Sequence, residues 1–393
     1  MNQDIKFGFW NYAPFGILDN KEAVLDWKNC GSNLPMSFVY DHSVDKKKDM
    51  LELLDECQKH GLKLIISDIR TPFTRLRTIS KEEYEKDVIE AYKDFGKHPA
   101  TFGFYIGDEP SPDESDLFIL AANIVLKNMP GLVPFGNLLP YFDGFDEKTN
   151  LGTERPHYEA LLARIIKESK LPVIGYDQYT QNYDEYYHPE AGINAYFNGL
   201  EIYHKVTKTC GVPFYVSLLS VGHWMYKVPT EDMIRWQIST AFAHGARGVI
   251  WFYFYQNDID LSYREAPFTG YLLRKTPMFD VISRQQYIFK TRYEEQFNKM
   301  ELEDVYHLNH IYKENQEVKE SEFIKELKIE RDFPVIVSTY KEFDSDKRFI
   351  SFVNGSQTHA NLFRLTWKNE KKETFWLAPG ELALFSLDDI FNK

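Results

Sequence analysis

The residues best suited to chemistry lie in the segment TFGFYIGDEP, from Thr101 to Pro110. An apolar and aromatic run leads directly into two adjacent acids, Asp108 and Glu109, and then a proline, so the segment predicts a buried strand that ends in carboxylates. Carboxylates are costly to bury without partners or a purpose, and a pair at a strand end is therefore a candidate acid/base site. The alternative is a capping role, because Ser111 and the acids after it suit the start of the following helix.

A third carboxylate, Asp177, follows another apolar run in the segment IGYDQY. A general acid needs a proton at its working pH, and both burial and a neighbouring carboxylate raise the pKa of a carboxyl. Asp108 is placed beside Glu109 to supply this like charge. We therefore predict Glu109, Asp177 and Asp108 as catalytic residues.

Other polar and aromatic residues expected at strand ends are suited to bind a sugar. Carboxylates and amides bind vicinal hydroxyls, and the faces of tryptophan and tyrosine stack on the C–H side of a sugar ring. We predict a carbohydrate ligand and these substrate-binding residues: Trp10, Asn11, Asp41, His42, Asp68, Arg70, Asn137, Tyr179, His223, Trp224, Trp251 and Tyr253.

Several of these residues have a purely structural interpretation. Asp41 and His42 are equally well suited to form a surface pair, and Asp68 with Arg70 to form an ion pair that orients the site. Trp251 lies in a strand that also fits a hydrophobic core.

Two loops are expected at the edge of the site. His223, in the segment SVGHW, is predicted either to bond the substrate or to be exposed to solvent. The segment Tyr183 to His188 is predicted to form the outer wall of the cleft.

The elements that position these residues alternate along the first three quarters of the chain. Short apolar runs alternate with longer amphipathic ones, which is typical of strands and helices around a parallel sheet. Eight such units over about 300 residues predict an α/β fold, a (β/α)8 TIM barrel, in which strand C-termini share one cavity. A doubly wound sheet is the alternative, but FGFWNYAPFG is not a glycine-rich phosphate loop. The predicted strands are Ile5 to Trp10, Pro35 to Tyr40, Leu62 to Ser67, the strand from Thr101, Leu132 to Asn137, Val173 to Tyr176, Phe214 to Leu219 and Gly248 to Tyr255.

The pattern changes after a predicted helix from Met278 to Met300. Short alternating strands separated by polar turns predict a small C-terminal antiparallel β-domain. We expect residues 1–300 to form the barrel and residues 301–393 to form a linker and a β-sandwich-like domain. The segment Lys313 to Glu330 is expected to be a linking helix or a loop.

The composition limits the classes of partner. A formal net charge of −13 disfavours nucleic acid and anionic membrane surfaces, which both need clustered lysine and arginine. The three cysteines are far apart, so we expect no disulfide framework and no zinc cluster. We also expect no cofactor. No segment predicts insertion into a membrane. We expect a soluble protein, cytoplasmic as written, or periplasmic or secreted if a signal peptide has been removed; the oligomeric state stays open.

Four segments carry a resemblance to a known family: GFYIGDEP, IGYDQY, WFYFYQ and the C-terminal LAPGELALFSL. With the order of the strands, they resemble barrel glycoside hydrolases of the β-galactosidase and cellulase superfamily. The resemblance covers nearly the whole chain, and its most specific part is the DEP element. It implies hydrolysis of glycosidic bonds in an oligosaccharide, polysaccharide or glycoconjugate, with Glu109 as the proton donor. Asp108 stands where the superfamily has asparagine, and strand seven, PFYVSLLSVGHW, lacks the nucleophilic glutamate.

Three sources of a second catalytic group stay open. Asp177 on strand six is one, since two-carboxylate hydrolysis needs a proton donor and a nucleophile or base. The second is the adjacent pair Asp108-Glu109, which resembles the signature of β-N-acetylhexosaminidases; there the substrate's acetamido group is the nucleophile, and Tyr179 would bond its oxygen. The third is Asp258 or Asp260, after strand eight.

Two further classes of protein remain as alternatives. The missing carboxylate on strand seven also fits a non-catalytic carbohydrate-binding barrel. A metal-dependent barrel enzyme is a third class, because Asp41, His42, Asp68 and Glu109 could in principle provide oxygen and nitrogen ligands.

Overall fold

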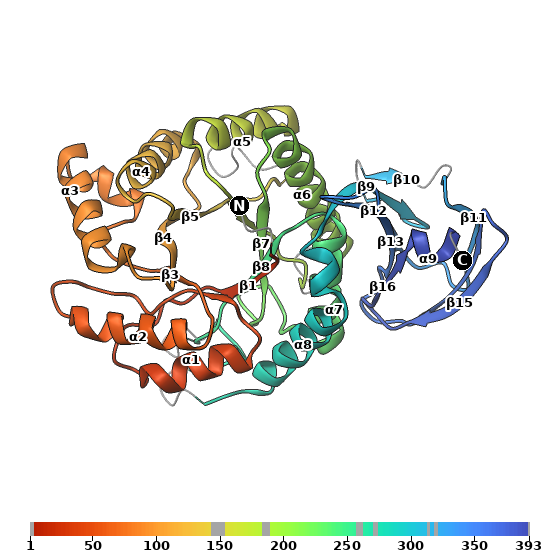
Figure 1. Ribbon diagram of the computed structural model, residues 1–393, viewed down its shortest axis with the longest axis horizontal. Coiled ribbons are helices and arrows are strands. Elements are labelled where there is room, and N and C mark those ends of the chain that lie inside the picture. The colour runs from red at the N-terminus through yellow and green to blue at the C-terminus, as the bar shows by residue number, and fades with distance from the viewer. Residues whose placement is uncertain are drawn as a thin grey trace.

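The computed structural model describes residues 4–142, 154–182, 189–256, 262–269, 274–312, 315–317 and 321–391. Eight parallel strands form a barrel surrounded by helices, and a separate β-domain lies beside it (Figure 1). The sheet order is β2-β1-β8-β7-β6-β5-β4-β3, and a parallel bridge between Met36 and Ile65 joins its two edges. The predicted fold, a TIM barrel with a C-terminal antiparallel β-domain, is therefore confirmed. The strands are β1 (Lys6–Phe9), β2 (Leu34–Pro35), β3 (Leu64–Ile66), β4 (Thr101–Asp108), β5 (Val133–Leu138), β6 (Ile174–Asp177), β7 (Phe214–Leu219) and β8 (Gly248–Phe252).

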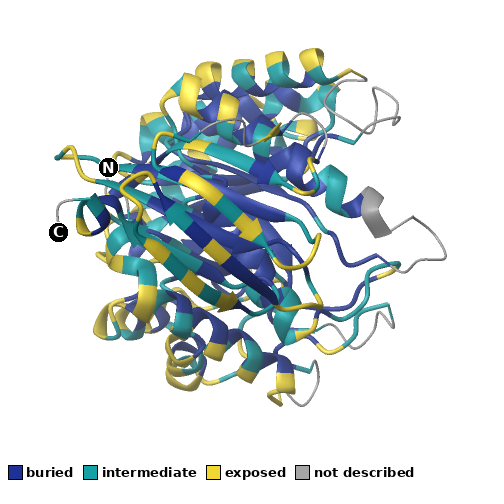
Figure 2. Ribbon diagram, turned by 90° about the vertical axis from the view of Figure 1, so that its right-hand side faces the viewer, coloured by how far each residue is buried: buried dark blue, intermediate teal, exposed yellow. Residues whose placement is uncertain are grey.

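Several helices of the barrel begin at side-chain caps and bury one face. Ser80 forms a capping box with Glu83 at the start of α3, and the hydroxyls of Thr230 and Thr276 accept backbone N–H bonds at the starts of α7 and α8. Figure 2 shows exposed outer faces and buried inner faces on these helices. They are α1 (Asn20–Asn29), α2 (Lys47–Lys59), α3 (Lys81–Ala91), α4 (Ser115–Asn128), α5 (Arg155–Ser169), α6 (Pro189–Cys210), α7 (Glu231–Ala243) and α8 (Pro277–Phe297).

Two apolar layers hold the barrel together. Alternate residues of the strands point inward, where Trp10, Phe135 and Ile250 belong to one buried cluster. Their neighbours point outward and pack against the helices, as Phe9 packs on Trp27 of α1 with ring centroids 5.6 Å apart. Because both faces of each strand are covered, the strands read as nearly continuous apolar runs.

The C-terminal domain consists of two sheets that enclose their own core. Buried aromatic side chains from both sheets, including Phe352, Phe363 and Trp367, fill the space between them. The expectation of a helix or loop between Lys313 and Glu330 was wrong, because its described part contains β10 and β11. One sheet contains β10 (Gln316–Glu317), β9 (Met300–Leu308), β12 (Val335–Glu342), β13 (Arg348–Asn354) and β16 (Leu382–Ser386), the other contains β11 (Ile324–Ile329), β14 (Asn361–Trp367) and β15 (Lys372–Leu377), and α9 (Leu387–Phe391) ends the described chain.

The β-domain packs against the flank of the barrel at α7 and α8. Trp236 Nε1 donates to the carbonyl of Gly355 at 2.8 Å, and Ser338 Oγ donates to the carbonyl of Ala243 at 2.8 Å. These bonds are buried, so they fix the β-domain on the outside of the barrel, next to helices rather than strand ends.

Some boundaries differ from the sequence-based expectation. Strand β8 ends at Phe252 instead of Tyr255, and α8 ends at Phe297 instead of Met300. None of the helices in the described part of the chain combines the length and apolar character that a membrane crossing requires.

Candidate active site

A cavity of about 730 Å³ opens at the carboxyl ends of the barrel strands. A cavity of this size accommodates a small ligand, and the C-terminal face is where barrel enzymes place their active sites. Its described lining combines acids, amides and aromatic rings: Trp10, Tyr12, Asp108, Glu109, Asn137, Leu139, Pro140, Tyr141, Phe142, Asp177, Gln178, Tyr179, Asn182, Gly192, Asn194, Ala195, Asn198, His223, Trp224, Met225, Tyr226, Phe252 and Tyr263.

The end of β4 turns both of its carboxyls toward this cavity. Successive strand residues normally face opposite sides, but the pairing of β4 with β5 has an irregularity between Tyr105 and Gly107. Gly107 has φ +140°, and a Cβ there would lie 2.2 Å from a ring carbon of Phe73. Glu109 follows with φ +45°, a left-handed conformation that is uncommon for a residue with a side chain. This local distortion explains why Asp108 and Glu109 both line the cavity.

An amide on β5 connects the acids of β4 and β6. Asn137 Nδ2 donates to Oδ1 of Asp108 and to Oδ1 of Asp177, each at 3.0 Å. Its own Oδ1 accepts a bond from Ser217 Oγ at 3.4 Å, and Ser217 accepts one from Trp10 Nε1 at 2.9 Å. This chain of bonds determines which way the amide of Asn137 points, and so holds two carboxyls in position.

The carboxyls of Glu109 and Asp177 are hydrogen-bonded to each other. Ionised carboxylates are acceptors only, so this bond requires a proton on one of the two. Asp177 is buried, with 7% of its surface exposed, whereas Glu109 at the end of β4 is exposed to the cavity. The site therefore contains one deep carboxyl and one accessible carboxyl that share a proton.

Burial and like charge raise the pKa values of all three acids. Burial raises the pKa of Asp108 to about 7, the charge of Glu109 adds to the shift, and the bond from Asn137 opposes it. Burial raises the pKa of Glu109, and the hydrogen bond with Asp177 opposes this shift. The pKa of Asp177 lies well above its usual range because of burial first, and then the charges of Glu109 and Asp108. Part of the cluster therefore stays protonated near neutral pH, as an acid catalyst requires.

Aromatic rings form the walls around these acids. Trp10 and Tyr12 stack with ring centroids 6.3 Å apart and an interplanar angle of 8°. On the other side, Tyr179 contacts Phe252 and Tyr226 with centroids 5.8 Å and 5.4 Å apart. No lysine or arginine occurs among the described lining residues. The site therefore presents acids and rings, a combination that suits an uncharged ligand with polar groups and apolar faces.

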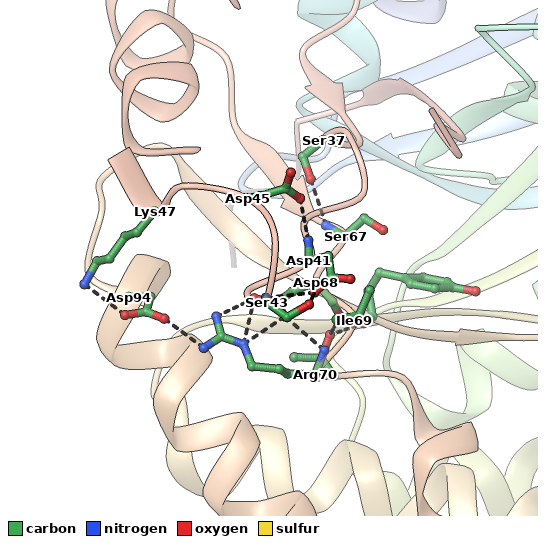
Figure 3. A network of polar contacts seen from close by, with 12 residues as sticks. Ser37, Asp41, Ser43, Asp45, Lys47, Ser67, Asp68, Ile69, Arg70 and Asp94 are labelled. Atoms are coloured by element: carbon green, nitrogen blue, oxygen red, sulfur yellow. Dashed lines mark hydrogen bonds and ion pairs between the residues drawn. The ribbon is translucent and has the colours of Figure 1, made fainter. Parts of the chain in front are cut away.

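Four predicted binding residues are not among the described lining residues of the cavity. Figure 3 shows the polar network around Arg70, whose Nη2 and Nε bind the carboxylate of Asp68, with the Nη2 to Oδ2 distance 2.7 Å, and whose Nη1 binds Asp94 at 2.8 Å. Asp41 caps a turn by accepting bonds from the backbone N–H and hydroxyl of Ser43, and the adjacent His42 is exposed. The structure therefore does not place Asp41, His42, Asp68 and Arg70 among the described lining residues of the cavity, and it gives the ion pair of Asp68 with Arg70 a structural role.

Three more predicted binding residues, Trp251, Asn11 and Tyr253, are not among the described lining residues of the cavity. Trp251 faces the helices, where its Nε1 donates to Gln286 of α8 at 3.4 Å, because strand residues alternate and its neighbour Phe252 faces the cavity. Asn11 is fully buried and bonds backbone groups of Ala13 and Met36. Tyr253 lies behind the wall, and its ring packs on Tyr12 and Tyr263, which do line the cavity.

The remaining predicted residues line the cavity together with several that the sequence did not indicate. Trp10, Asn137, Tyr179, His223 and Trp224 all border it. The additional residues come from the loops after β5, β6, β7 and β8 and from α6, and their positions carry no strand-end signal. They include Tyr141, Phe142, Asn182, Asn194, Asn198, Tyr226 and Tyr263. Gln178, which directly follows Asp177 at the strand end in the segment IGYDQY, also lines the cavity.

Two predictions lie outside the described residues, namely Asp258 with Asp260 and the wall from Tyr183 to His188. In the described part of the chain, no group of three or more histidine, cysteine, aspartate or glutamate side chains is arranged to hold a metal ion. Asp68, one of the four candidate ligands, is instead bound by Arg70.

No protein-family model and no curated protein sequence matches the chain. Solved structures do match its fold. A catalytic mutant of a family 42 β-galactosidase from G. stearothermophilus has a TM-score of 0.67 at 10% identity, with 98% of each chain covered. β-Galactosidases from Marinomonas ef1 and Halorubrum lacusprofundi each have a TM-score of 0.54, at 12% and 11% identity. They cover 75% and 73% of this chain, which spans 62% and 58% of theirs. The resemblance to barrel glycoside hydrolases is confirmed at the level of the fold.

Proposed function

We propose that the protein is a glycoside hydrolase that cleaves a glycosidic bond by carboxylate acid/base chemistry. The observation that carries this proposal is the convergence of Asp108, Glu109 and Asp177 on one cavity with aromatic walls. The fold shared with β-galactosidases, two of them covered to less than two thirds of their length, supports the same class of reaction. The substrate is an oligosaccharide, a polysaccharide or a glycoconjugate.

Glu109 is the proton donor in this proposal. Its carboxyl is accessible from the cavity, and its raised pKa keeps a proton available. As the bond between C1 and the glycosidic oxygen breaks, Glu109 gives its proton to that oxygen, and the leaving group departs as an alcohol. The carboxylate of Glu109 that remains then accepts a proton from the water that completes the reaction.

Asp177 is the nucleophile. Its carboxyl is buried and oriented by Asn137, and it attacks C1 as the carboxylate when the proton of the pair is on Glu109. With Asp177 as a nucleophile of the protein, the reaction passes through a covalent glycosyl intermediate. Water then attacks C1 and gives one proton to Glu109, while the bond from C1 to Asp177 breaks and leaves Asp177 as a carboxylate.

A second candidate is a substrate-assisted N-acetylhexosaminidase. It is favoured by one observation: the distorted end of β4 turns Asp108 and Glu109 toward the same cavity. Asp108 would orient the acetamido group of the substrate, whose oxygen attacks C1, and Tyr179 would bond that oxygen. This mechanism acts only on N-acetylated sugars.

The experiment compares wild type, Glu109→Gln and Asp177→Asn on aryl glycosides that include N-acetylated sugars, with good and poor leaving groups. Removing the acid lowers turnover by about 10²- to 10⁴-fold on poor leaving groups and less on good ones, which need no proton. Removing the nucleophile lowers turnover on both. Asp41→Asn is the control, because Asp41 caps a turn outside the cavity.

Each outcome selects one hypothesis. Turnover restricted to N-acetylated sugars favours the substrate-assisted mechanism. Full activity of Glu109→Gln on poor leaving groups contradicts the role of Glu109 in either mechanism. Sugar binding without turnover of any glycoside by wild type indicates a non-catalytic carbohydrate-binding barrel.

A further inference from the structure

The most exposed tryptophan of the chain stands at the edge of the cavity. Trp224 has 66% of its surface exposed, yet it belongs to the cavity lining. Of the seven tryptophans, only Trp376 in the β-domain is comparably exposed, at 59%. A large exposed ring at the edge of a pocket is typical of a ligand contact.

The ring of Trp224 belongs to a stack of three. It lies on His223 with ring centroids 4.2 Å apart and an interplanar angle of 29°. His223 in turn lies on Tyr263, with centroids 4.4 Å apart and an angle of 2°. Ser262 Oγ is 3.4 Å from His223 Nδ1. The stack leaves one face of Trp224 in contact with protein, so the ring orientation is set before a ligand arrives.

The backbone that carries the ring is also fixed. Trp224 has φ +46°, a left-handed conformation that is rare for a bulky residue and persists only where the surroundings enforce it. Arg264 Nη2 donates to the carbonyls of Trp224 and Tyr226, at 3.3 Å and 2.7 Å. The N–H of His223 bonds the carbonyl of Tyr226 at 3.0 Å. Such backbone strain is concentrated at binding and catalytic sites.

The positions of the carboxyls show which part of a substrate this ring meets. The sugar whose C1 reacts has to reach Asp177, which is buried. Glu109 protonates the glycosidic oxygen from the accessible side, so the leaving group lies between Glu109 and the mouth. An exposed ring at the edge of the cavity therefore lies on the leaving-group side of the cleaved bond.

We propose that Trp224 is the binding platform for the leaving group, and that the leaving group is a sugar or another ring with an apolar face. This inference rests on the proposed glycoside hydrolase function. It makes Trp224 a specificity-determining residue: the ring contributes to binding of the leaving group and takes no part in the chemistry of C1.

The test uses two substrates with the same reacting sugar and different leaving groups. One is a disaccharide, and the other is the glycosyl fluoride, whose leaving group is too small to touch Trp224. We expect Trp224→Ala to lower kcat/KM for the disaccharide by about 3- to 10-fold, mostly through KM, because a ring stack of this kind is worth about that ratio. The kcat/KM for the fluoride stays unchanged.

Two further variants separate the binding role from a structural one. Trp224→Phe keeps a ring and should restore most of the activity on the disaccharide. Trp376→Ala removes an equally exposed tryptophan on β15 and should change neither substrate. Equal losses on both substrates, or no loss on the disaccharide, would overturn the inference while leaving the hydrolase function in place. If wild type binds a glycoside but cleaves neither the disaccharide nor the fluoride of the same reacting sugar, the role of Trp224 and the hydrolase function are both overturned.

Discussion

Replacing Asp108 with asparagine should stabilise the protein at alkaline pH and leave its stability at acidic pH unchanged. The pKa of Asp108 is raised to about 7 by burial and by the charge of Glu109. Below the unfolded value of 3.8 the carboxyl is protonated in both states, and its folded state carries no penalty. As pH rises from about 4 to about 7, the carboxyl ionises in the unfolded chain but stays protonated in the folded protein, so stability is lost over this range and reaches its full loss above about pH 7. An asparagine does not ionise and keeps an acceptor for Asn137.

The shift sets the size of this effect. A difference of about 3 pKa units between the folded and unfolded states lowers the free energy of unfolding by at most about 4 kcal/mol above pH 7. Asp108 is half-buried at a cavity open to water, so we expect the free energy of unfolding to change by about half of this upper limit, about 2 kcal/mol. For a chain of 393 residues the unfolding entropy is about 0.8 kcal/mol per degree, which predicts a rise in Tm of about 2 to 3 °C.

The assay is thermal unfolding of wild type and Asp108→Asn, followed by circular dichroism between about pH 4 and about pH 8.5. Asp344→Asn, the same substitution at an exposed position between β12 and β13, is the matched control and should shift Tm by less than about 1 °C. A difference between Asp108→Asn and wild type that does not grow with pH would refute the reasoning. So would destabilisation at the alkaline end.

Three further substitutions test the fold and the cavity. His244 and His307 share a bond between their Nε2 atoms at 3.0 Å, and burial lowers both pKa values, that of His244 to about 4. The free energy of unfolding should therefore fall by about 1.4 kcal/mol per pH unit for each histidine below about pH 6.5, and acid unfolding of His307→Gln should show a smaller slope than wild type. Gly107→Ala should cost at least about 1 kcal/mol more in urea unfolding than Gly61→Ala, because both have positive φ but only at Gly107 would the added Cβ meet a ring carbon at 2.2 Å; equal costs would contradict this. Gln178 lines the cavity with 1% exposure, and neither of its amide atoms has a hydrogen-bond partner among the residues that the structure describes. Gln178→Met should therefore raise KM by about 5-fold without lowering Tm, and lower Tm with unchanged KM would show a structural role instead.

The sequence by itself determined the architecture of this protein and the carboxylates of its candidate site. Helix and strand periods are local properties, so eight alternating units could be counted before any contact was known. The TIM barrel topology then placed every strand C-terminus at one face, which grouped Glu109 with Asp177 although 68 positions separate them. The acids stood out because a carboxylate that ends an apolar run is unusual in any structural role.

Only the tertiary structure decided which side chains reach the cavity. Barrel strands are apolar on both faces, so the sequence did not show that Trp251 points to the helices and Phe252 to the cavity. The sequence also did not show that Arg70 binds Asp94, because another element brings Asp94 Oδ2 to 2.8 Å from Arg70 Nη1. The exposed wall around Trp224 depends on the stacking of loops that are distant along the chain. Local patterns specify where a strand ends, but long-range packing specifies which way its side chains face and what covers them.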